Sequence, residues 1–353
     1  MISNRATSDV ATGNDPIVVL AADENFAIPL AVTIRSALEN LAADRRLRIF
    51  VLDGGIHADT KKRLLDSWPS DRCQVEWLSV DAAALAGLPC SGHINLVSYY
   101  RILIPRVLPD AFERVIYLDS DLIVREDLGR LWDCPLAVNL CLAAPDVSAP
   151  YLDSTTMLPN YERCSAYLSS THPVPNFREL GLSPRAPYFN AGVMSINLAA
   201  WRREDVARQC LECLDKNRQH VLAWDQYALN IVLADRWEAI DLRWNQGSHA
   251  LLYPTWEQSP LDQRTYEQLR ESPHIVHFTT RDKPWMPLCK HPFRSEFFAY
   301  LDRTQWAGWR PSRVKLMLEL VRLQERRLRQ FRKSLVERGR DFLKRETRPR
   351  SAA

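Results

Sequence analysis

Short apolar runs and segments of helical spacing alternate along the first part of this chain. Residues 17–22 form an apolar run, and apolar residues then recur every three or four positions over 30–41. Two further strand-like runs occupy 47–55 and 74–80, with a segment of helical character at about 61–68 between them. This order is typical of βαβ units. It predicts an α/β fold with a Rossmann-like, mostly parallel twisted sheet flanked by helices on both faces.

The pattern continues beyond residue 98 and is interrupted once. Further strands are predicted at 114–121, 139–146, 188–198, 237–245 and 274–278, and helices at about 99–107, 199–216 and 225–234. Between 147 and 187 the periodicity stops, and Pro, Ser, Thr and Tyr are frequent. Loops of this length are uncommon inside a compact domain unless they have a function. We therefore expect a long excursion beside the functional site.

Positive charge is concentrated at the C-terminal end. The chain has 353 residues and a formal net charge of +3, yet from residue 311 onward it has 14 Lys or Arg against 5 Asp or Glu. We expect a disordered polar N-terminus at 1–15, one domain at 16–310, and a basic amphipathic helical tail at 311–353. Such a tail could bind an anionic membrane surface or pack on the domain as a solvated helix. Nucleic acid is not expected as a partner, because no base-reading motif accompanies the charge.

The sequence favours a cytoplasmic protein. The first residues lack the basic-then-apolar order of a secretory signal, and no apolar stretch has the length of a membrane span. Eight cysteines are scattered along the chain, and Cys210 and Cys213 are interpreted as buried thiols rather than a metal or redox pair. We expect a reducing compartment, with the basic tail at the inner face of the cell membrane.

Two carboxylates directly follow the strand predicted around 114–118. In open parallel sheets, ligands collect beyond the carboxyl ends of the strands, where Asp119 and Asp121 lie. Extended geometry would direct both side chains to one side and Ser120 away from them. Two close carboxylates raise each other's pKa unless a cation or donor compensates, and oxygen ligands suit Mg²⁺ or Mn²⁺. A capping turn with one solvated Asp is the alternative.

Three further stretches form, together with residues 117–124, a set of four motifs in a fixed order along the chain. They are VLAADENFAIPLAVTIRSALEN at 19–40, FNAGVMSINLAAWR at 189–202 and HFTTRDKPW at 277–285. Over about 17–298 the chain resembles glycosyltransferase family 8, and within it the bacterial lipopolysaccharide galactosyl- and glucosyltransferases. The resemblance implies a GT-A type fold and a retaining, UDP-sugar-dependent hexosyltransferase.

The resemblance also implies roles for particular residues. It implies Mn²⁺ or Mg²⁺ as the cofactor, with Asp119, Asp121 and His277 as metal ligands. Asp225 and Gln226 would be the catalytic residues near the donor sugar. The implied donor site consists of Ala21, Ala22, Asp23, Asn25, Phe26, Arg101, Asp119, Ser120, Asp121, Asn190, Ala191, Thr280 and Lys283. Thr280 departs from the family pattern, because members often have glycine at this position, where backbone approaches phosphate.

The implied reaction moves galactose or glucose from UDP-galactose or UDP-glucose to a hydroxyl of a saccharide or glycolipid. No carboxylate is evident for a double displacement, so front-face attack is favoured. The excursion at 147–187 would form a lid or acceptor wall, with Tyr151, Tyr161 and Tyr167 available to stack on sugars. The lipopolysaccharide acceptor is an expectation from resemblance.

Two other functions compete with this interpretation. The first is a non-catalytic sugar-nucleotide-binding or membrane-associated protein. The second is a haloacid dehalogenase-type phosphohydrolase, which also has Asp-x-Asp after a buried strand. That class usually has the pair near the N-terminus and Thr or Val two residues after the second Asp, where this chain has Ile123. It also leaves the 277–285 stretch unexplained.

Overall fold

The computed structural model describes residues 15–88, 96–312, 317 and 321. The expected disordered N-terminus therefore lies outside the described residues, apart from Asp15. Most of the expected basic tail also lies outside them, although Met317 and Val321 are helical. Within the described part of the chain, no helix is both long and apolar enough to cross a membrane.

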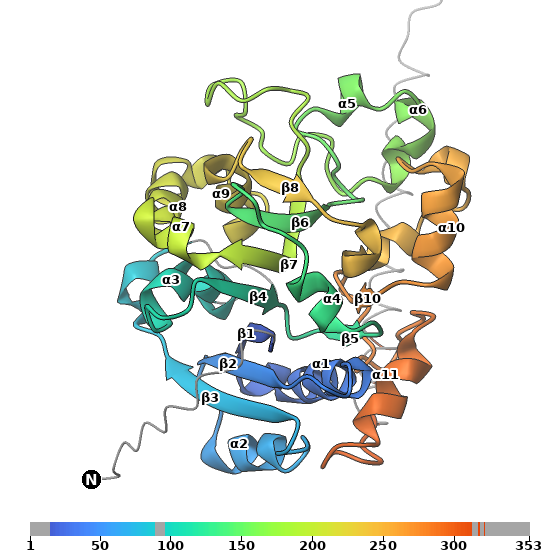
Figure 1. Ribbon diagram of the computed structural model, residues 1–353. Coiled ribbons are helices and arrows are strands. Elements are labelled where there is room, and N and C mark those ends of the chain that lie inside the picture. Colours follow the sequence, from blue (N-terminus) through green and yellow to red (C-terminus); the bar gives the residue numbers. More distant parts are fainter. Residues whose placement is uncertain (1–14, 89–95, 313–316, 318–320, 322–353) are drawn as a thin grey trace, which may run out of the picture.

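A seven-stranded sheet forms the centre of the domain (Figure 1). Its order is β3-β2-β1-β4-β7-β6-β8. The strands are β1 (Ile17–Ala22), β2 (Leu47–Asp53), β3 (Cys73–Ser79), β4 (Arg114–Leu118), β6 (Cys141–Pro145), β7 (Phe189–Asn197) and β8 (Trp237–Ala239). All neighbours pair in parallel except around β7, which is antiparallel to β4 and to β6. The mostly parallel α/β sheet predicted from the sequence is thus confirmed.

Helices flank both faces of this sheet. The α-helices are α1 (Ala27–Asn40), α2 (Ala58–Leu65), α3 (Ile104–Val107), α4 (Leu128–Trp132), α5 (Ser154–Met157), α6 (Tyr161–Cys164), α7 (Leu198–Arg203), α8 (Val206–Lys216), α9 (Trp224–Val232), α10 (Gln263–Glu271) and α11 (Arg294–Leu301). The 3₁₀-helices are Glu24–Phe26, Ala82–Leu85, Leu96–Leu103, Ser165–Tyr167, Arg218–His220, Leu242–Asn245, Ser248–Leu251 and Trp256–Gln258.

Alternate residues of the strands enter two separate cores. Val18 and Leu20 of β1 pack with α1 and α11 on one face. Val19 packs on the other face, with the Leu96–Leu103 helix and helices α7 to α9. This alternation follows from the two-residue period of a strand. Burial on both faces explains why the strands appear in the sequence as nearly continuous apolar runs.

A second, three-stranded sheet was not predicted. Its strands are β5 (Leu122–Val124), β10 (Ile275–His277) and β9 (Gln246–Gly247), with β10 in the middle. His277 pairs with Leu122 across the antiparallel β5–β10 ladder. This pairing brings a residue from near the C-terminal end of the domain beside the segment that follows β4.

The helix expected at about 99–107 is mostly a 3₁₀-helix. The winding is 3₁₀ over Leu96–Leu103, and only α3 is α-helical. Five consecutive residues, 99–103, are buried. An α-helix with one apolar stripe cannot bury five residues in a row on a single face, so packing on two sides overrides the helical preference.

Candidate active site

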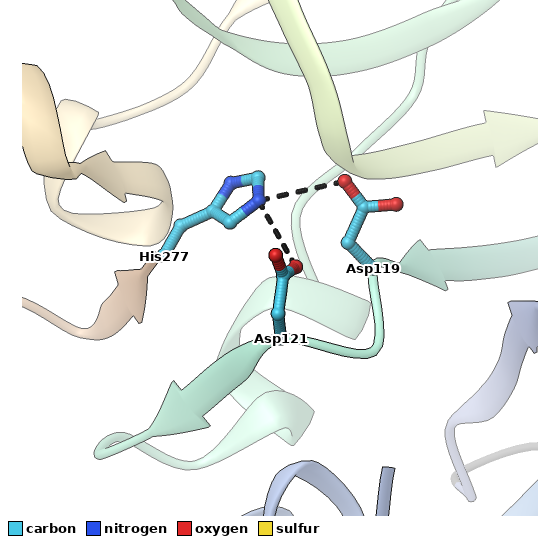
Figure 2. A group of neighbouring side chains, drawn as sticks. All are labelled: Asp119, Asp121 and His277. Carbon is cyan, nitrogen blue, oxygen red and sulfur yellow. Dashed lines mark ion pairs between the residues drawn. The ribbon is translucent and has the colours of Figure 1, made fainter. Parts of the chain in front are cut away.

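Asp119, Asp121 and His277 converge at the end of β4 (Figure 2). One potential ligand atom of each residue lies within 4.8 Å of the others. His277 Nε2 lies 3.5 Å from Asp119 Oδ2 and 3.4 Å from Asp121 Oδ1. Asp121 and His277 are buried, and Asp119 is partly exposed. Two carboxylates and one imidazole form a ligand set suited to a divalent cation.

The connection between β4 and β5 holds the two aspartates in place. Ser120 points away from them and donates from Oγ to the carbonyl oxygen of Ala21 at 2.7 Å. The Thr33 hydroxyl of α1 lies 2.9 Å from the Ser120 carbonyl oxygen and accepts from the Leu122 amide at 3.0 Å. The predicted arrangement, with both carboxylates on one side and Ser120 on the other, is confirmed.

Asn245 orients the His277 ring. Its Oδ1 lies 2.8 Å from His277 Nδ1, while its Nδ2 donates to Asn190 Oδ1 at 2.9 Å. An amide oxygen accepts only, so Nδ1 carries a proton and Nε2 is the ring nitrogen that faces the two carboxylates. Such second contacts fix the tautomer of metal-binding histidines. The site therefore fits a divalent cation. Asn245 was not predicted, because its distance in sequence from His277 hides the contact.

Gly192 of β7 leaves room for these ligands. A Cβ at this position would lie 2.2 Å from His277 Cε1 and 2.7 Å from Asp119 Oδ2. The Gly192 carbonyl oxygen also accepts from the Asp119 amide at 2.8 Å. The absence of a side chain at residue 192 thus allows β7 to pass directly beside the candidate metal ligands.

Arg101 lies between two acidic groups. Its Nη2 lies 2.8 Å from Asp119 Oδ1, and its Nε lies 2.9 Å from Asp225 Oδ2. Nη1 donates to the Ala191 carbonyl oxygen at 2.7 Å. Burial raises the pKa of Asp225, the positive charge of Arg101 lowers it, Asp119 raises it again, and the result is about 6. One guanidinium shared by two carboxylates does not fully compensate either of them.

Lys283 supplies a second cation. Its Nζ lies 2.5 Å from Asp121 Oδ2 and also donates to the Phe278 carbonyl oxygen. Burial raises the pKa of Asp121, but the Lys283 ammonium and the His277 ring outweigh burial and hold it well below its usual value. Apart from His277, this part of the site has three carboxylates, Asp119, Asp121 and Asp225, and two cations, Arg101 and Lys283. A divalent cation would offset the remaining negative charge.

These residues line a cavity of about 230 Å³. Thirteen of the sixteen predicted site residues are in its wall: Ala21, Ala22, Asp23, Phe26, Arg101, Asp119, Ser120, Asp121, Asn190, Asp225, Gln226, His277 and Lys283. Asn25, Ala191 and Thr280 are not in the wall. Thr279 lines it instead of Thr280, whose Oγ1 accepts from the Asp282 amide at 3.3 Å.

The part of the implied donor site at residues 21–26 contributes to the wall of this cavity. Asp23 Oδ1 accepts from the Phe26 amide at 3.1 Å and so caps the Glu24–Phe26 helix. Asn25 is exposed, and its Nδ2 donates to Asp23 Oδ2 at 3.4 Å. The Phe26 ring meets the Trp285 ring edge-on, with 6.0 Å between the ring centroids. Asp23 is therefore the N-cap of this 3₁₀-helix.

A second cavity of about 420 Å³ adjoins the first. Asp146 lies in its wall and was missed in the sequence. Asp146 Oδ2 accepts from Gln226 Nε2 at 3.1 Å and from Asn190 Nδ2 at 3.3 Å. The buried Tyr188 and the partly buried His249 complete the polar wall. Asp146 ends the expected strand at 139–146, which is the signal that could have identified it.

The excursion contributes to this second cavity through small residues. Ser148, Ala149, Ser169, Ser170 and Pro173 line it. The three tyrosines expected to stack on sugar pack instead against a satellite core around Tyr253 and Tyr266. None of the three is in the wall of either cavity, within the part of the chain that the structure describes. Their rings contribute to this satellite core.

Trp224 starts α9 in a left-handed conformation. Its φ is 47°, which bulky residues rarely adopt. Such a conformation costs about 1–3 kcal/mol and persists where the surroundings enforce it, often at functional sites. Asp225 and Gln226 are the next two residues, so this turn sets how both of them enter the site.

The fold and site together define a glycosyltransferase of the GT-A class. Among solved structures, the chain is similar to the galactosyltransferase LgtC in complex with donor and acceptor sugar analogs. The TM-score is 0.66 at 25% identity, and the match covers 82% of this chain and 96% of LgtC.

The chain belongs to glycosyl transferase family 8, whose profile matches residues 17–289. It is 32% identical over 292 residues to general stress protein A of Bacillus subtilis, covering 82% of this chain and 94% of that protein. It is 24% identical over 290 residues to lipopolysaccharide 1,3-galactosyltransferase of Salmonella typhimurium, covering 81% of this chain and 77% of that protein. The family suggested by the sequence motifs is confirmed.

Proposed function

We propose that this chain is a retaining, metal-dependent glycosyltransferase that moves galactose or glucose from the UDP-sugar to a hydroxyl of a saccharide or glycolipid. The convergence of Asp119, Asp121 and His277 within 4.8 Å carries the proposal. These three residues would hold Mn²⁺ or Mg²⁺, and the imidazole favours Mn²⁺. When bound, the cation supplies positive charge for the diphosphate of the donor.

The protein's own groups would bind the donor and stabilise the departing UDP. Lys283, in the wall of the first cavity, would contact the diphosphate as a point charge. Phe26 and Asp23 are in the same wall, where the uracil would stack on the Phe26 ring and donate its N–H to Asp23. Preorganised charges of this kind act most strongly where negative charge grows during bond cleavage.

The configuration of the anomeric carbon would be retained because the acceptor attacks this carbon from the same face that UDP leaves. A double displacement needs a carboxylate near the anomeric carbon that is free to attack. Asp225 is paired with Arg101. Gln226 Oε1 accepts from the backbone amide of Ala191 at 3.1 Å, and Gln226 Nε2 donates to Asp146 Oδ2. Both arrangements support positioning roles for Asp225 and Gln226 rather than nucleophilic attack. The acceptor oxygen would therefore attack the anomeric carbon directly, as its proton passes to the departing phosphate oxygen.

The second cavity is the proposed acceptor site. The polar groups of its wall are mainly hydroxyls and amides, which suit the hydroxyls of a saccharide. The excursion at 147–187 would act as the acceptor wall or as a lid. The basic tail at 311–353 would place the enzyme on an anionic membrane surface, and the location we propose is the inner face of the cell membrane, in the cytoplasm.

Donor turnover tests this proposal. The purified chain is incubated with UDP-glucose, UDP-galactose and other UDP-sugars in the presence of Mn²⁺, and free UDP, free sugar and inorganic phosphate are measured. Release of UDP with an α-configured sugar, abolished by a chelator, is expected. Binding without turnover would support a non-catalytic sugar-nucleotide-binding protein. Release of inorganic phosphate would support a phosphohydrolase.

A further inference from the structure

We propose that Trp224 screens the anomeric carbon of the donor from water in this enzyme. The inference rests on the proposed function and adds a positioning residue to it. Trp224 is not among the residues implied by the family motifs. It is inferred from its place between the two cavities and from its backbone conformation.

The two cavities share a short common wall. Five residues line both of them: Asn190, Ala223, Trp224, Gln226 and Thr279. A donor sugar in the first cavity and an acceptor in the second would meet at this wall. Water competing with the acceptor must reach the same place. The residues of the common wall therefore influence which nucleophile arrives.

Trp224 is the one large residue of this wall. Gln226 and Asn190 are fixed by their hydrogen bonds to Asp146. Thr279 is fixed through Oγ1, which accepts from the Ser248 amide at 3.1 Å. Ala223 is small. The indole, partly buried and packed on the core that includes α8 and α9, has the bulk needed to exclude water.

The position of the neighbouring residues supports this role. Leu222 is 55% exposed and lines the second cavity, so the wall reaches the molecular surface two residues before Trp224. The left-handed φ of 47° then turns the chain inward, so that Asp225 is buried against Arg101. A bulky residue keeps this conformation only where its surroundings hold it. Trp224 thus lies between solvent and the reacting groups.

The two competing reactions break the same bond. In transfer, the acceptor oxygen bonds to the anomeric carbon, the bond to the β-phosphate oxygen breaks, and the acceptor proton passes to that oxygen. In hydrolysis, a water oxygen takes the acceptor's place, and the products are free sugar and UDP. Removing the indole should admit water without removing any group that binds UDP. Hydrolysis should then become faster, whereas structural damage would make it slower.

The test compares variants of the full chain without an acceptor. The probe is the UDP-sugar that the parent chain hydrolyses fastest, with Mn²⁺, and the affinity for UDP is measured by calorimetry. Trp224→Ala and Trp224→Gly should each raise the hydrolysis kcat at least about fivefold with UDP affinity unchanged. Trp224→Phe should bring the rate back towards that of the parent. Trp256→Ala, at an exposed tryptophan that lines neither cavity, is the matched control.

Several outcomes would overturn the inference. Hydrolysis by Trp224→Ala and Trp224→Gly at or below the parent rate, with UDP affinity retained, would reject it. Should Trp224→Ala fail to fold, Trp224→Gly decides alone, because glycine adopts φ 47° without a Cβ penalty. A parent chain that turns over no UDP-sugar would reject the proposed function and this inference together. Turnover by the parent without a rise in the variants rejects this inference alone.

Discussion

The Arg101 guanidinium lies 2.9 Å from the Asp225 carboxylate, and both side chains are almost fully buried. The same guanidinium reaches Asp119, one of the three candidate metal ligands. Arg101 therefore joins the candidate metal site to Asp225, which is predicted to lie near the donor sugar.

Replacing Asp225 by Asn should stabilise the protein while impairing transfer. Burial raises the pKa of Asp225 from 3.8 to about 6, which corresponds to about 3 kcal/mol against the ionised form. This cost is absent below pH 3.8, grows as pH rises through 6, and is complete above it. In the presence of a chelator, urea unfolding should show Asp225→Asn gaining on the parent between about pH 4 and about pH 6, with a constant difference above that range. A difference that does not change with pH would contradict the assigned shift.

Replacing Arg101 by Met should destabilise the protein strongly. The change leaves Asp119 and Asp225 buried or partly buried without their shared cation, and losing one partner of a buried ion pair costs about 3–5 kcal/mol. Adding Asp225→Asn to Arg101→Met should recover part of the free energy of unfolding, but no transfer activity. The measurement is denaturant unfolding of the two single variants and the double variant. Equal stability of Arg101→Met and the double variant would argue against the shared pair.

Replacing Gly192 by Ala should weaken metal binding more than it weakens the fold. The new methyl group would meet His277 at 2.2 Å and Asp119 at 2.7 Å, so the ligands must separate. Manganese affinity measured by calorimetry should fall by at least about tenfold, as expected when ligand geometry is disturbed. Gly129→Ala in α4 is the matched control, because its Cβ would meet only the Arg45 side chain. Similar affinities in both variants would contradict the prediction.

Replacing Asn245 by Ala should also lower metal affinity. Without the acceptor for Nδ1–H, His277 loses the contact that fixes its tautomer, and such changes typically cost about 10–100-fold in metal affinity. In Asn245→Gln the longer side chain would move the amide oxygen away from His277 Nδ1, so this variant is expected to recover little of the metal affinity. Manganese titration of each variant checks this, with thermal unfolding as the control for folding. Unchanged affinity in Asn245→Ala would show that the ring is held by other contacts.

The sequence allowed the parallel sheet and most of the first cavity to be predicted. Buried strands appear as apolar runs, and the carboxyl end of β4 locates Asp119 and Asp121. The small sheet of β5, β9 and β10 could not be predicted, because each of its three strands has only two or three residues. Without the family motifs, the approach of His277 to the two aspartates would therefore have been missed.

Other residues of the site were hidden for different physical reasons. Asn245 acts through a contact with a residue distant in sequence and has no local signal that distinguishes it. Gly192 lies in the 189–202 motif, but its close approach to His277 and Asp119 depends on the tertiary structure. Trp224 could not be singled out from the sequence, because a positive φ at a non-glycine residue has no sequence signature. The tyrosines of the excursion were expected to contact sugar, but aromatic residues also form small cores, which is their role here.

The most direct test of the account is calorimetric titration of UDP into the parent chain and into Asp119→Ala and Asp121→Ala, with Mn²⁺ and with a chelator. Circular dichroism of each variant controls for folding. The account predicts that the parent binds UDP tightly only with Mn²⁺, and that both variants lose at least about a hundredfold in affinity, or about 3 kcal/mol. Manganese-dependent UDP affinity that is unchanged in both folded variants would contradict it.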